Sequence, residues 1–206
     1  MVLAQVPLGG APTIGLVAIL FSAALTDNIL LTRFLGMCSF LAVSRQIKAA
    51  LGLGLAVTFV TTCTTFLNAV LYRHVLAPLG LGLSLKLILF IIVIAAFVQL
   101  LEMVVERVSL GLYYALGIFL PLITVNCAIL GAALFMVNLQ YNVVQALIYG
   151  FGAGAGWMLA IVLMAGIRER LKKSQIPPAL EGPGIALIIT GIMALAFVGF
   201  SGMVQQ

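Results

Sequence analysis

The chain alternates between long apolar runs and short polar connections. Six apolar segments can be drawn, at about residues 13–43, 49–72, 84–106, 112–137, 143–166 and 183–204. A bilayer core of about 30 Å takes roughly 20 apolar residues of helix to cross. The pattern therefore predicts an all-α membrane protein with six transmembrane helices, which together form a single integral membrane domain over residues 1–206.

Two of the six segments contain residues that interrupt a helix. These residues are Asp27, Asn28 and Arg33 in the first segment and Gly117, Pro121 and Asn126 in the fourth. Proline removes an amide donor and clashes with the carbonyl four residues back. In lipid, a broken backbone persists only where protein buries it or where it lines a polar cavity. We therefore expect helices 1 and 4 to be interrupted, with Gly36, Pro121 and Asn126 supporting the breaks.

The two halves of the chain resemble each other. Each holds an interrupted segment that ends near a cysteine, in FLGMC (34–38) and LPLITVNC (120–127), and each continues into a glycine-rich span. With three helices per half, the second half enters the membrane in the opposite direction. The pattern predicts two inverted three-helix repeats, at about 13–106 and 112–204, whose broken helices meet near the bilayer midplane.

The composition excludes the usual soluble classes. Of the 206 residues, 64% are hydrophobic and only 7% are charged, whereas soluble domains carry about 25% charged residues. Disorder needs few apolar residues and high charge, so it is excluded too. We expect no separate extramembrane catalytic domain, and any chemistry takes place in or beside the bilayer.

The excess of basic residues, a formal +5, indicates orientation in a membrane and not nucleic acid binding, because these residues lie in the connections. The connections after helices 1, 3 and 5 share one face. That face holds Arg45, Lys48, Arg107, Arg168, Arg170, Lys172 and Lys173, against Arg73 and Lys86 on the other. We therefore expect a protein of the cell inner membrane whose first face is cytoplasmic and whose two termini are periplasmic or external.

The three cysteines are too few for a disulfide framework. Cys38 and Cys127 each follow a helix break, and an inverted repeat would bring them to the same depth. Thiolates suit iron–sulfur clusters, zinc or copper, and a [2Fe–2S] cluster takes four cysteines, so a cluster here needs two ligands from another chain. The alternative is that both are small buried hydrophobes. Cys63 is assigned to packing.

Two carboxylates are candidates for an ion pathway. Glu102 lies about a turn deeper in helix 3 than Glu106, which we expect at the interface. An ionisable group within a span is costly and points to function, and its oxygens suit Na⁺ or a proton path. Asp27 makes a similar case with Arg33 as counter-charge; alternatively, Asp27 caps a helix.

The glycine-rich runs and one basic segment have simpler readings. Gly150, Gly152, Gly154 and Gly156, like Gly52 and Gly54, do not follow the dinucleotide-binding pattern. Small residues of this kind let helices pack closely in lipid. The basic segment IRERLKK (167–173) is expected to contact lipid, or else to dock the acidic face of a soluble partner.

Five segments resemble one family of membrane subunits. They are TRFLGMCSFLAVSR (32–45), VQLLEMVVER (98–107), LGIFLPLITVNCAILG (116–131), YGFGAGAGWMLAIVLMAGIRE (149–169) and FSGM (200–203). From about residue 20 to 204 the chain is similar to the NqrE/RnfA family. These subunits belong to the Na⁺-translocating NADH:quinone oxidoreductase (Nqr) and the ferredoxin:NAD⁺ oxidoreductase (Rnf), which couple electron transfer to ion movement.

The resemblance implies a subunit that is not catalytic alone. Family members pair with a homologous subunit of opposite orientation, NqrD or RnfE, and the pair holds one [2Fe–2S] cluster with two cysteines from each chain. Cys38 and Cys127 match the ligand positions, and Glu102 matches a carboxylate linked to sodium uptake. The implied function is electron relay between partner subunits that carry flavins and iron–sulfur clusters, coupled to Na⁺ or H⁺ translocation.

Other readings compete at two levels. CSFLAVSR, ITVNCAI and GWMLAIV favour NqrE, whereas RHVLAPLGLGLSLK and GLGLAVTFV favour RnfA, and on balance the chain leans towards NqrE. At the level of class, inverted repeats with broken helices also occur in secondary transporters. A structural membrane anchor for a partner enzyme is the third reading.

Overall fold

The computed structural model describes residues 15–76, 83–108, 120–172 and 182–201, and these residues form only helices and their connections. Four helices are long and apolar enough to cross a membrane: Ile47–Leu76, Leu85–Val104, Val143–Leu171 and Pro183–Phe200. Two shorter apolar helices, Leu16–Thr26 and Leu122–Asn138, belong to the first and fourth predicted segments. The predicted all-helical membrane protein is confirmed, and six complete crossings stay a prediction.

The helices follow the predicted segments in order. The first segment is split into α1 (Leu16–Phe21), the π-helical turn η1 (Ser22–Thr26) and α2 (Met37–Val43). The fourth is split into α7 (Leu120–Thr124) and α8 (Cys127–Asn138). The others are α3 (Ile47–Leu71) with the π-helical turn η2 (Tyr72–Leu76), α5 (Leu83–Val108), α9 (Val143–Leu171) and α10 (Pro183–Ser201). The expected interruptions of helices 1 and 4 are therefore present.

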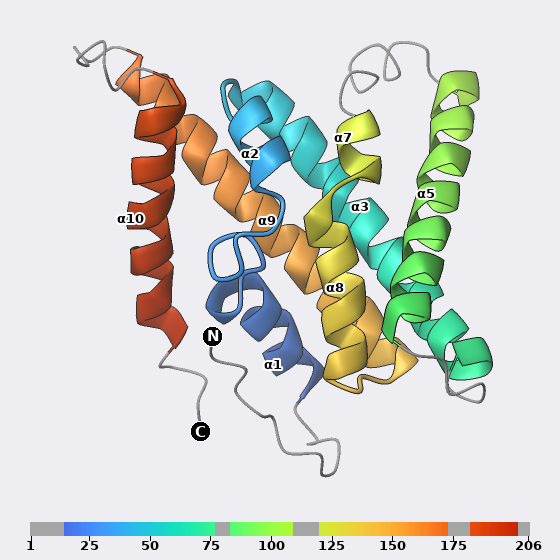
Figure 1. Ribbon diagram of the computed structural model, residues 1–206. Coiled ribbons are helices and arrows are strands. Elements are labelled where there is room, and N and C mark those ends of the chain that lie inside the picture. Colours follow the sequence, from blue (N-terminus) through green and yellow to red (C-terminus); the bar gives the residue numbers. More distant parts are fainter. Residues whose placement is uncertain (1–14, 77–82, 109–119, 173–181, 202–206) are drawn as a thin grey trace.

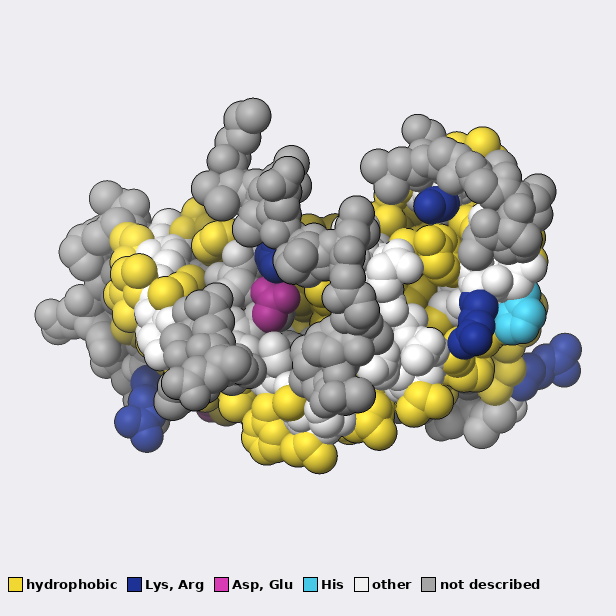
Figure 2. All heavy atoms as spheres, turned by 90° about the horizontal axis from the view of Figure 1, so that it is seen from below, with side chains coloured by type: hydrophobic (Ala, Val, Ile, Leu, Met, Phe, Trp, Pro, Cys, Tyr) yellow, Lys and Arg dark blue, Asp and Glu magenta, His cyan; other side chains and the backbone are white. Residues whose placement is uncertain are grey.

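The long helices α3 and α9 cross at the centre of the molecule and form its most extensive contact (Figure 1). The pieces of the two interrupted segments pack against this pair, α1 and η1 on α9 and α8 on both. The helices α5 and α10 lie at opposite edges (Figure 1). Seen from below, the surface carries wide hydrophobic areas and few charged side chains (Figure 2). Large hydrophobic side chains are also exposed along the long helices, for example Leu55 in α3, Ile92 in α5 and Leu195 in α10, and this suits a lipid environment.

Successive segments run in alternate directions (Figure 1). The end of α2, the start of α3 and the ends of α5 and α9 lie at the upper edge, whereas α5 begins and α8 ends at the lower edge. The basic residues predicted to share one face belong to these upper ends, apart from Lys173, which lies outside the described residues. The structure thus places these basic residues at one end of the helices, and the side of the membrane that this end faces stays a prediction.

Glycines let α9 approach its neighbours on two faces. A Cβ at Gly154 would lie 2.6 Å from the Cα of Thr58 in α3. A Cβ at Gly156 would lie 2.6 Å from the carbonyl oxygen of Ala24 in η1. Gly150 and Gly152 repeat these two contacts one turn earlier along α9. The packing interpretation of this run is confirmed, but Gly52 has no such neighbour within 4 Å.

Candidate functional site: two helix breaks in contact

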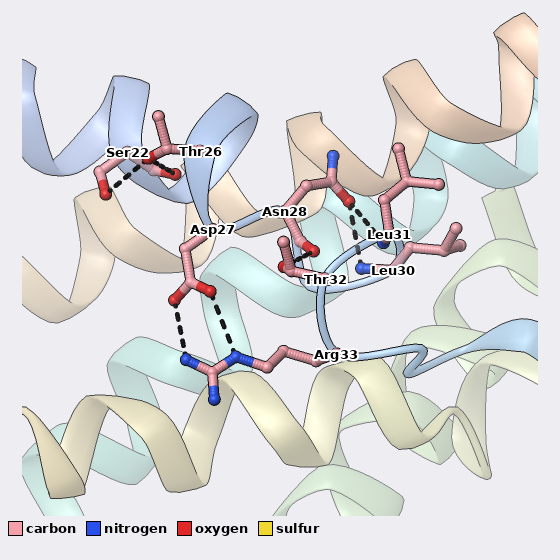
Figure 3. Close-up of polar contacts among 8 residues, drawn as sticks. All are labelled: Ser22, Thr26, Asp27, Asn28, Leu30, Leu31, Thr32 and Arg33. Atoms are coloured by element: carbon pink, nitrogen blue, oxygen red, sulfur yellow. Dashed lines mark hydrogen bonds and ion pairs between the residues drawn. The ribbon is translucent and has the colours of Figure 1, made fainter. Parts of the chain in front are cut away.

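The first break spans residues 27–36 and is held by the buried side chain of Asn28 (Figure 3). Its Oδ1 accepts hydrogen bonds from the backbone N–H groups of Leu30 and Leu31, at 3.1 and 3.3 Å. Its Nδ2 donates to the carbonyl oxygens of Ala24 and Gly156, at 3.0 and 2.8 Å. Buried backbone groups need such partners when a helix stops. Asn28 therefore supplies partners that the broken backbone needs and joins the break to α9.

Asp27 faces Arg33 across the same break (Figure 3). Its Oδ1 lies 3.2 Å from Arg33 Nε, and its Oδ2 accepts a second bond from Nη2 at 3.4 Å. The Arg33 guanidinium also lies 4.8 Å from the ring centroid of Phe135 in α8. Arg33 is thus the counter-charge, as expected from the sequence. Asp27 directly follows the end of η1, and the next helix begins only at Met37, so Asp27 does not cap the start of a helix.

The Asp27 carboxylate also affects the pKa of a tyrosine, Tyr141, in the connection between α8 and α9. Burial raises the pKa of the Tyr141 hydroxyl above its ordinary value, and the negative charge of Asp27 raises it further. Tyr141 follows the end of α8, at the lower edge of the molecule in Figure 1. Asp27 therefore lies within electrostatic reach of that edge.

The second break separates α7 from α8 at Val125 and Asn126. The Oδ1 of Asn126 accepts from the backbone N–H of Ala128 at 3.1 Å, so Asn126 caps the start of α8. Pro121 lies inside α7, and the helix ends after it at Thr124. The break is thus placed by Asn126, not at the proline. Gly117 lies outside the described residues.

The two breaks touch each other. The backbone N–H of Gly36 donates to Cys127 Sγ at 2.9 Å, and Asn126 Nδ2 donates to Ser39 Oγ at 3.3 Å. Gly36 has φ of +82°, and a Cβ there would lie 2.6 Å from Trp157 Nε1 and 3.0 Å from Asn126 Oδ1. Glycine is needed at this point for its left-handed backbone and for the close approach of the second break.

The contact brings both candidate cysteines to one region. Cys127 is the first residue of α8 and reaches Gly36, two residues before Cys38, which is the second residue of α2. Both are exposed on this chain, whereas Cys63 is half-buried within α3. Exposed thiols are open to further ligands from a second chain.

The donor set fits half of an iron–sulfur site. Among the described residues, no group of three or more His, Cys, Asp or Glu side chains could hold a metal ion. A four-cysteine cluster would therefore take its other two ligands from elsewhere. Both cysteines lie in the first turn of a helix, directly after a break. The N–H of Gly36 on Cys127 Sγ is a bond of the kind that tunes cluster potentials.

Sequence reasoning passed over two residues beside this site, Ser39 and Trp157. The Trp157 indole is fully buried, and its Nε1 lies against Gly36 with no hydrogen-bond partner among the described residues. Nothing in the sequence singled out Ser39, because a serine after Cys38 matches no recognisable functional pattern. Trp157 could have been singled out, because it is the only tryptophan in the sequence and directly follows the glycine run of α9.

Glu102 lies apart from these contacts. It is half-buried in α5, two residues before the end of the Leu85–Val104 apolar stretch. Among the described residues, no hydrogen bond or ion pair joins it to Asp27, whose ion-pair partner is Arg33. The structure therefore does not unite the two candidate carboxylates into one site, and the ion pathway stays a prediction.

Comparison with known proteins assigns the family. The model of a family described as "Rnf-Nqr subunit, membrane protein" matches residues 16–204. The chain is 52% identical over 188 residues to the A-type subunit of the Na⁺-translocating ferredoxin:NAD⁺ oxidoreductase complex of Acetobacterium woodii, covering 91% of this chain and 97% of that protein. It is 53% identical over 192 residues to the E-type subunit of the Na⁺-translocating NADH-quinone reductase of Aeromonas hydrophila, with the same coverage.

A third relative repeats the result. Over 191 residues the chain is 53% identical to the E-type subunit of the Na⁺-translocating NADH-quinone reductase of Aeromonas salmonicida, covering 90% of this chain and 96% of that protein. The chain is as similar to the A-type relative as to the E-type relatives, so the preference for NqrE stays a prediction. The helical fold, the motifs at both breaks and these matches agree that the chain belongs to the Rnf-Nqr family of membrane subunits.

Proposed function

We propose that the chain is a membrane subunit of a Na⁺-translocating oxidoreductase complex, the E-type subunit of an NADH-quinone reductase or the A-type subunit of a ferredoxin:NAD⁺ oxidoreductase. Relatives of both names match it over nearly their whole length. The four spans and two interrupted segments support an integral membrane role within such a complex. The subunit relays electrons and is not catalytic by itself.

Within that complex, Cys38 and Cys127 supply two of the four ligands of a [2Fe–2S] cluster, and a homologous partner subunit of opposite orientation supplies the other two. The observation that carries this proposal is the 2.9 Å contact from Gly36 N–H to Cys127 Sγ. It ties the two breaks together while both thiols stay exposed. When bound, a cluster of this type carries a single electron.

The position of the breaks suits electron transfer across the membrane. Both lie at mid-height between the upper and lower edges of the molecule (Figure 1). A hydrocarbon core of about 30 Å is too wide for one efficient electron hop, so a carrier at mid-height divides the path. Partner subunits with flavins and iron–sulfur clusters would deliver and accept the electron on the two faces.

The repeat and the orientation belong to the same proposal. The interrupted segments run in opposite directions in Figure 1, which supports an inverted repeat of two three-helix halves. The upper edge, with Arg45, Lys48 and the basic end of α9, faces the cytoplasm of an inner membrane. The external position that the charge pattern predicts for both termini belongs to the same proposal.

The cluster assignment is tested by measuring iron and acid-labile sulfide in the purified complex. We expect Cys38→Ala and Cys127→Ala each to lose about one cluster per complex while the complex still assembles. Cys63→Ala is the matched control and keeps wild-type iron, because Cys63 lies half-buried within α3. Unchanged iron in both variants would refute the shared site and favour a secondary transporter, the class that also uses broken helices.

The ion pathway is proposed to include Glu102 and Asp27, coupled to Na⁺ or H⁺ movement. Glu102 lies within the apolar stretch of α5, and the exposed Glu106 one turn later provides a matched control. We expect Glu102→Gln to lower sodium-dependent turnover at least about tenfold, since a carboxylate at this depth in a span is costly and functional. Glu106→Gln should stay near wild type. Full turnover in Glu102→Gln would remove this carboxylate from the pathway.

A further inference from the structure

A basic pocket opens where α3 begins and α9 ends, away from the two breaks. Its volume is about 620 Å³, and it is lined by Arg45, Gln46, Ile47, Lys48, Glu169 and Lys172. The volume falls in the range of small-molecule sites, roughly 300–1,000 Å³. We propose that this pocket binds the phosphate headgroup of an anionic phospholipid. The proposal does not depend on the cysteine site.

The charges in the pocket favour an anion. Three cations face one carboxylate, that of Glu169. Lys172 Nζ donates to the carbonyl oxygen of Arg45 at 3.1 Å, a bond that holds this ammonium at the pocket while leaving its charge unneutralised. Among the described residues, the one ion pair within 4 Å is Asp27–Arg33, so Arg45, Lys48 and Lys172 have no carboxylate partner there. The described lining residues therefore carry three positive charges against one negative charge, an excess that favours an external anion.

Arg168, which precedes the pocket residue Glu169, is hydrogen-bonded beside the pocket. Arg168 Nη1 donates to the Leu41 carbonyl oxygen at 3.0 Å and to Ser44 Oγ at 2.8 Å. These bonds join the last turns of α9 to α2, through Leu41, and to the connection that follows α2, through Ser44. Arg168 thus holds the two segments that line the pocket next to each other. Since its guanidinium is already hydrogen-bonded, Arg45 is the arginine that lines the pocket and can bind a ligand.

An apolar stripe continues from the pocket along α3. Leu51, Leu55 and Phe59 follow Lys48 at helical spacing and are 39%, 61% and 55% exposed. The pocket lies where α3 begins and α9 ends, two helices long and apolar enough to cross a membrane, and the stripe runs from it along α3. A phospholipid would use both parts, the phosphate in the pocket and an acyl chain on the stripe. Neither a free phosphate ion nor an acidic protein surface would use the stripe.

The test is lipid retention by the purified, delipidated complex. The complex is incubated with phosphatidylglycerol, phosphatidylcholine or inorganic phosphate, and bound lipid is quantified by mass spectrometry. We expect preferential binding of phosphatidylglycerol, weakened about tenfold by the double change Arg45→Gln and Lys48→Gln. Arg170→Gln removes a positive charge from the same end of α9 without lining the pocket, and it should bind like the wild type.

Three results would overturn the proposal. Equal loss of lipid in Arg170→Gln would show that only general surface charge matters. Competition by inorganic phosphate at concentrations similar to the lipid would show a free-anion site. A double variant that keeps its lipid but loses a partner subunit would show a protein docking site. Thermal unfolding of every variant checks that the exposed substitutions leave the fold intact.

Discussion

Neighbouring polar side chains in the first break have different tasks, as Asn28 and Asp27 show. Asn28 is fully buried and makes four hydrogen bonds, two of them to the broken backbone itself. Asp27 is 38% exposed and pairs with Arg33. From the sequence both residues marked an interruption, but only the fold shows that Asn28 supports the broken backbone whereas Asp27 pairs with Arg33.

Gly36 is the residue at which a single methyl group should matter most. An alanine there would need a left-handed backbone and would clash with Trp157 and Asn126. We expect Gly36→Ala to lower the free energy of unfolding by about 1–3 kcal/mol. The thermal midpoint of the purified complex measures this change.

The matched control for Gly36 is Gly52→Ala. Gly52 lies within α3 and has no atom within 4 Å of an added Cβ. Because alanine favours helices over glycine by roughly 0.5–1 kcal/mol, this variant should be as stable as the wild type or slightly more so. Equal destabilisation by both substitutions would show that Gly36 has no special role at the contact of the breaks.

At the scale of elements, the crossing of α3 and α9 depends on small residues on both helices. The threonines Thr58, Thr61 and Thr65 face the α9 glycines, and their hydroxyls donate to carbonyls of their own helix. Hydroxyls satisfied within the helix can lie in a buried interface without a penalty for unmade hydrogen bonds. The sequence predicted close packing here, but not which neighbour each glycine meets.

Gly154→Ala tests this crossing. An added Cβ would lie 2.6 Å from the Cα of Thr58, and backbone atoms cannot rotate aside. Overpacking of this kind costs about 1–3 kcal/mol, so the helices must separate and the thermal midpoint in detergent should fall. Gly166→Ala, on the same helix with no atom within 4 Å, serves as control. If both variants unfold alike, close approach at Gly154 does not stabilise the fold.

For the whole molecule, the alternating directions of the segments predict opposite exposure of two connections. Gln46 lies between α2 and α3 at the upper edge, and Gln140 lies between α8 and α9 at the lower edge; both are exposed. The basic upper edge should face the cytoplasm. In intact cells, a membrane-impermeant maleimide should therefore label Gln140→Cys and leave Gln46→Cys unlabelled until the cells are opened.

Labelling of the otherwise unchanged chain measures the background from its three cysteines. The reverse pattern, with Gln46→Cys labelled in intact cells, would invert the proposed orientation. Labelling of both positions from outside would contradict the alternation of the segments across the membrane.

The sequence by itself determined the membrane class, the six apolar segments and the residues at which two of them break. These features depend on local quantities: the length of an apolar run and the helix-breaking or polar residues within it, of which Asn126 stands at the second break whereas Pro121 lies inside α7. It also marked Cys38 and Cys127, because each follows a break. Predictions of this kind need no knowledge of how distant segments pack.

Only the tertiary structure decided which groups meet. The bond from Gly36 to Cys127 joins residues 91 positions apart, and that from Asn28 to Gly156 joins residues 128 apart. Such pairs depend on the relative placement of whole helices, which the crossing of α3 and α9 sets. An apolar pattern of period 3.6 says which face of a helix is buried but not against which partner. For the same reason only the structure identified Trp157 as part of the site, because this α9 residue lies against Gly36 at the contact of the two breaks.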